Sequence, residues 1–112
     1  MLVACAVTGV VVPAVVLRES PRAYVITAID YHFHDAHPTL PIAPGRDVIV
    51  KNAGRNPHNV TIPEMSVATD LAPGDAFTIE DVAGRFAPGR YVFVCRFHED
   101  RGMTGVIVLV GP

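Results

Sequence analysis

The sequence predicts an all-β domain built as a two-sheet antiparallel sandwich, and two observations support this. From residue 23 onward, turn residues recur about every ten to fifteen positions, and the runs between them are short and rich in Val, Ile, Phe, Tyr and Thr. In addition, Ala-Pro-Gly stands before three strand-like runs, at Ala43, Ala72 and Ala87. Proline fixes φ at one central turn position and glycine accepts a positive φ at the next, so each tripeptide predicts a type II turn that leads into a strand.

The expected strands follow from these runs in chain order. The runs "YVFVC" and "GVIVLV" are apolar almost throughout, as in strands central to a sandwich, whereas "RDVIVKN" becomes polar at both ends. None of the runs has the period of a helix. Residues 63–75 hold no obvious strand, and we expect them to cross between the sheets. The six expected strands cover residues 23–30, 46–52, 58–62, 76–80, 90–95 and 105–110.

The N-terminal segment differs from the rest of the chain. Residues 1–17 carry no charge, and Arg18 is the first charged residue. The segment is near the lower limit for crossing a bilayer and lacks the basic start of a secretory signal. It could be the remnant of an export signal, a short membrane anchor or an extra apolar strand, whereas a lipobox ending at Cys5 fits poorly with the apolar residues that follow. We favour an export or anchoring segment over residues 1–20 and one domain over residues 21–112.

Length and charge argue against several classes of function. With 112 residues, the chain suits a single domain with one site, and we expect a monomer. The formal net charge is −2 and the basic residues are scattered singly, which argues against binding to nucleic acid. The two cysteines, Cys5 and Cys95, lie in the apolar segment and in a histidine-containing motif, so a disulfide between them is not expected.

The stretch "VCRFHEDRGM" is chemically the most specific part of the chain. A nucleophilic Cys95 with His98 as its base would leave Met103 without a role, and no helix is expected to begin there and activate the thiol. Zinc would require four strong ligands, and the chain has no second cysteine outside the N-terminal segment. Copper can use a thiolate, two imidazoles and a distant thioether. Such a site gives Cys95, His98 and Met103 each a role as a ligand, and it requires a second histidine from elsewhere in the chain. His58 in "NPHNVT", at the start of an expected strand, can supply it.

Two segments, "KNAGRNPHNVTIPE" and "GRYVFVCRFHEDRGMTGVIVLV", resemble the cupredoxins, which are small blue copper proteins such as plastocyanin, pseudoazurin and amicyanin. The resemblance covers residues 23–110 and implies a Greek-key β-sandwich with one type 1 copper per chain. It assigns the equatorial ligands His58, Cys95 and His98 and the weak axial ligand Met103. It also implies that Asn59 ties the two ligand loops together by hydrogen bonds and directs its backbone amide at the cysteine sulfur. Phe97 departs from the proline that plastocyanins carry before the second histidine.

The function that this resemblance implies is electron transfer by copper that cycles between Cu(I) and Cu(II), and not an enzymatic reaction. Electrons would pass through the exposed edge of His98 to redox protein partners that dock weakly and briefly. Pro57, Met65 and Phe97 are expected to supply apolar surface around it, among charges of mixed sign. The expected location is periplasmic or otherwise extracytoplasmic, with a membrane tether through residues 1–17 as one option. The alternative function is copper delivery or sequestration, whereas an oxidase or nitrite reductase would need more domains and more copper sites.

A second group of histidines lies in "DYHFHDAHP". His32 and His34 would project from one face of a strand while Phe33 points to the other, so they could chelate a second metal together with His37 or Asp35. However, the run from Asp30 to Phe33 also resembles the first strand of cupredoxins, on whose outer face histidines need no function. A second metal site is therefore the weaker interpretation.

Overall fold

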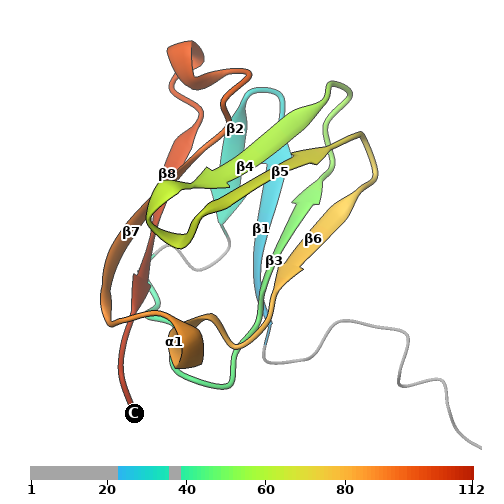
Figure 1. Cartoon of the computed structure of the whole chain (residues 1–112). Helices are drawn as coiled ribbons and strands as arrows, with labels where there is room; N and C mark the ends of the chain where they lie inside the picture. The colour runs from blue at the N-terminus through green and yellow to red at the C-terminus, as the bar shows by residue number, and fades with distance from the viewer. Residues whose placement is uncertain (1–22, 36–38) are drawn as a thin grey trace, which may run out of the picture.

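Two four-stranded sheets pack face to face in the computed structural model, which describes residues 23–35 and 39–112 (Figure 1). The first sheet consists, in spatial order, of β2 (His32–Asp35), β1 (Tyr24–Ile29), β3 (Val48–Asn52) and β6 (Ala76–Ile79). The second consists of β5 (Val67–Leu71), β4 (His58–Ile62), β7 (Gly89–Val94) and β8 (Thr104–Leu109). The described residues also form three short helical turns between strands: η3 (Pro63–Met65), α1 (Val82–Arg85) and η4 (Glu99–Arg101). The predicted β-sandwich is confirmed, whereas the boundary predicted near residue 20 lies outside the described residues.

All six expected strands are present, and the expectation for residues 63–75 was right in one part and wrong in the other. The chain does cross between the sheets within this segment, at residues 72–75 between β5 and β6. However, the segment also contains η3 and then β5, which pairs antiparallel with β4 from Ile62↔Val67 to His58↔Leu71. β5 was not predicted because its sequence, "VATDL", has small and polar residues at the positions that face solvent.

The pairing within the first sheet includes one parallel pair. β1 runs parallel to β3 with Tyr24 opposite Val48, whereas the pairs β1–β2 and β3–β6 are antiparallel. The short hairpin between β1 and β2 has a two-residue turn, because Ile29 pairs directly with His32. This turn lies at the end of the sandwich that also carries the loop between β7 and β8, as Figure 1 shows.

The first two Ala-Pro-Gly tripeptides form the predicted turns. Gly45 and Gly74 have φ of 89° and 91°, and the amides of Arg46 and Asp75 donate to the carbonyls of Ala43 and Ala72 at 3.4 and 2.9 Å. A positive φ at the third position and this hydrogen bond are the features of a type II turn. The third tripeptide differs, since its glycine, Gly89, has φ of 149° and is already the first residue of β7.

The core lies between the two sheets and follows the alternation of each strand. β1 alternates between buried and half-buried residues and directs Tyr24 and Ile26 into the same core as Phe93 and Ile107 of the second sheet. The hydroxyl of Tyr24 donates to Asp35, and burial raises the pKa of this tyrosine above its ordinary value. Within the described part of the chain, none of the helices is long and apolar enough to cross a membrane.

Gly105 on β8 provides a test of this packing. It pairs with Phe93, and a Cβ at position 105 would lie 2.3 Å from the tip of that buried ring. We expect Gly105→Ala to lower the free energy of unfolding by about 1–3 kcal/mol, because the core must shift to accept the methyl group. Chemical denaturation measures this, with Gly111→Ala as control, since a Cβ there meets Pro88 at an ordinary 3.5 Å. Equal stability of both variants would contradict the packing described.

Candidate metal centre

Three of the four predicted ligands occupy inward-facing positions at strand ends. His58 is the first residue of β4, on the same face as the buried Val60 and Ile62. Cys95 directly follows β7 and continues the inward series of Tyr91 and Phe93. Side chains two residues apart lie on one face of a strand, so the same alternation that builds the core directs these side chains between the sheets. Met103 precedes β8 and continues the inward series of Ile107 and Leu109 in the same way.

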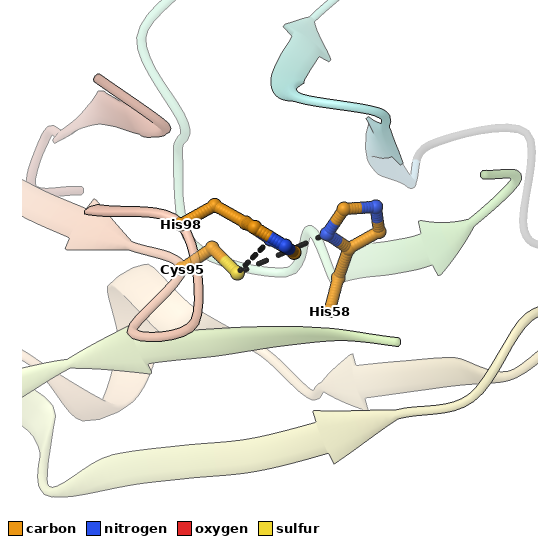
Figure 2. Close-up of side chains that lie close together, drawn as sticks. All are labelled: His58, Cys95 and His98. Atoms are coloured by element: carbon orange, nitrogen blue, oxygen red, sulfur yellow. Dashed lines mark hydrogen bonds between the residues drawn. The ribbon is translucent and has the colours of Figure 1, made fainter. Parts of the chain in front are cut away.

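The side chains of His58, Cys95 and His98 converge on one point (Figure 2). The Cys95 Sγ lies 3.9 Å from His58 Nδ1 and 3.6 Å from His98 Nδ1, and the three donor atoms lie within 4.8 Å of one another. A metal ion bound in trigonal or tetrahedral geometry, at about 2.0 Å from nitrogen and 2.3 Å from sulfur, holds a sulfur and a nitrogen donor about 3.5–3.7 Å apart. The two sulfur–nitrogen distances are therefore close to those of a metal site.

Met103 lies beside this set in the interior. Its side chain is fully buried and packs in one cluster with Cys95 and Ala28, next to Phe33. The amide of Cys95 donates to the carbonyl of Met103 at 3.0 Å, and the amide of Met103 donates to the carbonyl of His98 at 3.3 Å. These two bonds close the loop that carries three of the predicted ligands.

Asn59 connects the two ligand segments. Its backbone amide donates to Cys95 Sγ at 3.3 Å, and its side-chain oxygen accepts from the amide of Arg96 at 3.3 Å. The side chain is itself fixed, because its nitrogen donates to Asp70 at 2.9 Å and its oxygen accepts from the Thr61 hydroxyl at 2.6 Å. The hydrogen bonds that the resemblance implied for Asn59 are thus present.

The far side of the His58 ring contacts an aspartate, Asp30, that no sequence pattern placed there. Asp30 Oδ1 lies 2.7 Å from His58 Nε2, and the amides of Arg55 and Asn56 donate to the same carboxyl group at 3.0 and 3.4 Å. The hydrogen bond from Arg55, followed by those from His58 and Asn56, lowers the pKa of Asp30 against a smaller opposing effect of desolvation. Asp30 therefore stands as a carboxylate near neutral pH.

The His98 ring has a neighbour of its own that sequence reasoning also missed. The ring centroids of Tyr31 and His98 are 4.6 Å apart with an interplanar angle of 56°. Arg101 lies over the Tyr31 ring, with its Cζ 4.4 Å from the centroid. Neither Asp30 nor Tyr31 is adjacent in sequence to a ligand, so only the three-dimensional structure could reveal these contacts.

The surface around His98 differs from expectation at one residue. Phe97 is 47% exposed and Pro57 is exposed, but Met65 is 6% exposed and belongs to the main core. Met65 is buried because η3 turns it inward under the second sheet, so its predicted place in an apolar surface patch was wrong. The charged residues of mixed sign around the site are all exposed, namely Arg55, Arg96, Glu99, Asp100 and Arg101.

The second histidine group receives no support from the residues that can be described. His32 and His34 are both exposed on the edge strand β2, while Phe33 between them packs against the core. Asp35 accepts the hydrogen bond from Tyr24, and His37 lies outside the described residues. Among residues 23–35 and 39–112, His58, Cys95 and His98 form the one group of His, Cys, Asp or Glu side chains close enough to hold a metal ion.

Comparisons with known proteins agree with this fold. The structure superimposes on a purple cupredoxin from Nitrosopumilus maritimus with a TM-score of 0.59 and 20% identity, over 78% of this chain and 99% of that one. For reduced auracyanin from Roseiflexus castenholzii, the TM-score is 0.60 at 20% identity, over 82% and 99% of the chains. A Cu-containing nitrite reductase from Thermus scotoductus also matches, with a TM-score of 0.64 at 20% identity, but the match covers 84% of this chain and 24% of the enzyme.

The family assignment rests on the sequence itself. No curated protein matches the chain. Residues 2–109, nearly the whole length of the chain, match the family described as "Cupredoxin-like domain". Together with the two sheets and the converging cysteine and histidines, this match shows that the chain belongs to the cupredoxin-like domain family.

Proposed function

We propose that this protein is a one-electron carrier that holds a single type 1 copper ion. His58, Cys95 and His98 would be the equatorial ligands, Met103 the weak axial ligand, and Asn59 a hydrogen-bond partner of the thiolate. The observation that carries the proposal is the position of the Cys95 sulfur, fully buried and 3.6–3.9 Å from the Nδ1 atoms of two histidines. A soft thiolate with two imidazoles is a donor set suited to copper in either oxidation state.

Zinc fits this donor set less well. Structural zinc sites use four strong nitrogen, sulfur or oxygen ligands. The described residues bring three such donors together, and the side chain that lies beside them, Met103, offers only a thioether. A weak, long axial thioether is a feature of blue-copper electron-transfer sites.

The surrounding protein restrains the donors, which is what a carrier requires. Bound copper would supply the chemistry, which is the gain and loss of one electron. The chain keeps the donors in place: the Asn59 amide donates to the Cys95 sulfur, and backbone bonds at 3.1 and 3.3 Å tie His98 to Cys95 and Met103. Donors that move little between two charge states lower the cost of reorganisation. A delivery protein would instead need accessible ligands, whereas Cys95 and His58 are fully buried.

The proposed route for electrons leads through His98, the least buried of the three donors. The exposed Phe97 lies beside it, with ring centroids 6.5 Å apart, and supplies apolar contact area for a redox partner. Small, weak interfaces are typical of transient electron-transfer encounters. We further propose an extracytoplasmic monomer without enzymatic activity, in which residues 1–20 serve for export or anchoring.

Addition of Cu(II) to the metal-free protein is expected to produce an intense blue colour. The colour arises from charge transfer between the Cys95 thiolate and the metal, and visible absorption spectroscopy measures it. The Cys95→Ser variant should lack the absorption band that the parent protein shows. A pale or colourless product from the parent would contradict the proposed site.

Met103→Leu is expected to keep the blue colour and raise the reduction potential. Leucine conserves the volume of the buried side chain but removes the sulfur, which as a weak donor favours Cu(II) over Cu(I). We expect a shift of about 59 mV or more, since a one-electron couple moves by that amount for each tenfold change in its equilibrium. Redox titration followed by the blue band measures it. Loss of copper instead would show that Met103 is more than a weak axial ligand.

One copper ion per chain is expected to remain after exhaustive dialysis. The exposed His32 and His34 stand on an edge strand and belong to no close donor group among the described residues. Elemental analysis counts the metal, and His32→Ala with His34→Ala should leave the count at one. Two tightly held ions in the parent and one in this double variant would favour a second site.

A further inference from the structure

The turn between β1 and β2 contacts both histidines of the proposed copper site. It consists of Asp30 and Tyr31, and neither belongs to the segments that carry the ligands. The ligands all come from the second sheet and the loops attached to it, whereas this turn belongs to the first sheet. Like Ala28 and Phe33, which pack beside Cys95 and Met103, it brings the first sheet into contact with the candidate ligands of the second.

Asp30 is held in one orientation toward His58. Its carboxyl group lies 2.7 Å from Nε2 and accepts the amides of Arg55 and Asn56, so three donors surround two oxygens. A carboxylate can only accept hydrogen bonds, so the contact places the proton of His58 on Nε2. The lone pair is then left on Nδ1, the nitrogen that faces the Cys95 sulfur at 3.9 Å.

The local backbone leaves room for this contact. A Cβ at Gly54 would lie 2.3 Å from Asp30 Oδ1 and 3.0 Å from His58 Nε2. Gly54 itself is fixed, because its amide donates to the side chain of the buried Asn52 at 2.8 Å. The loop before β4 thus encloses the pair closely on the side opposite the metal donors.

Tyr31 acts on the other histidine. Its ring packs against His98 at 4.6 Å between centroids, and its hydroxyl accepts from Asn56 Nδ2 at 3.2 Å. Arg101, from the same loop as His98, lies over the Tyr31 ring. A cation over an aromatic face is attracted to the ring, so these contacts together restrain the half-buried imidazole.

We propose that Asp30 and Tyr31 are positioning residues for the two histidine ligands. Asp30 fixes the tautomer and direction of the His58 ring, and its charge favours the more positive copper ion. Tyr31 holds the His98 ring against the site. The effects on copper rest on the proposed function, whereas the tautomer of His58 can be measured without any metal.

The first experiment therefore uses metal-free protein. Long-range proton–nitrogen NMR correlations of the His58 ring are expected to show the Nε2-protonated tautomer in the parent and in Asp30→Asn, whose amide oxygen can still accept. Asp30→Ala should show a mixture of tautomers. Asp100→Asn is the matched control, because it removes the same charge from an exposed residue on the neighbouring loop. An unchanged tautomer in Asp30→Ala would overturn the role of Asp30.

The second experiment adds copper to the same variants. Loss of a hydrogen-bond partner of a metal-ligating histidine typically weakens metal binding about 10–100-fold, and we expect a loss of that size in Asp30→Ala. Asp30→Asn keeps the hydrogen bond but lacks the charge, so it should weaken Cu(II) more than Cu(I) and raise the reduction potential relative to Asp100→Asn. If Asp30→Ala fails to fold, the reduction potential of Asp30→Asn still tests the role of the Asp30 charge. A potential equal to that of Asp100→Asn would overturn that role. Failure of the parent to bind copper would reject the proposed function, while the NMR result for His58 would stand.

The third experiment concerns Tyr31. Transfer of Cu(I) to a competing chelator should be several-fold faster in Tyr31→Leu, because His98 loses the ring that restrains it. Tyr31→Phe keeps the ring and should transfer copper at the rate of the parent. Thermal unfolding of the metal-free variants checks that both retain the fold. Equal transfer rates in the parent, Tyr31→Phe and Tyr31→Leu would overturn the role of Tyr31.

Discussion

The alternation of side chains along the strands of the second sheet sets the geometry of the candidate metal centre. His58, Cys95 and Met103 each occupy an inward position at the end of a strand whose other inward residues form the core. A shift of one residue in any of these strands would turn a predicted ligand to solvent together with the core residues behind it. The hydrophobic core therefore fixes the register, and the register brings three of the four predicted ligands to one end of the sandwich.

Burial of polar donors at this end has a cost that hydrogen bonds offset. His58 and Asn59 are almost completely removed from water, and an unpaired polar group in such a place costs about 1–3 kcal/mol. Asp30 satisfies the imidazole, while Asn59 is engaged by Thr61, Asp70 and Arg96. Among the described residues, no buried side-chain nitrogen or oxygen lacks a partner. The result is a site whose candidate donors lie close together and are restrained by the surrounding chain.

Sequence alone predicts those features that depend on neighbouring residues. The runs of apolar residues and the Ala-Pro-Gly turns locate six strands, and the spacing of Cys95, His98 and Met103 predicts a metal-binding loop. β5 was missed because the residues on its exposed face are small or polar, which leaves no long apolar run. Met65 was misplaced because one turn of η3 directs it inward, which its sequence context does not indicate. Asp30 and Tyr31 were missed for a stronger reason: their contacts depend on how the two sheets pack.

The parallel pairing of β1 with β3 explains how that packing brings the turn to the site. The amide of Ala53 donates to the carbonyl of Ala28 at 2.9 Å, which extends the pairing beyond β3 into the loop that precedes β4. Residues 30 and 54–56 are thereby brought side by side, and β4 begins immediately afterwards with His58. The first sheet contributes no metal donor among the described residues, yet it determines the orientation of the His58 ring. An isolated second sheet could bring Cys95 near Met103, but it could not orient His58. The proposed site therefore requires both layers of the sandwich.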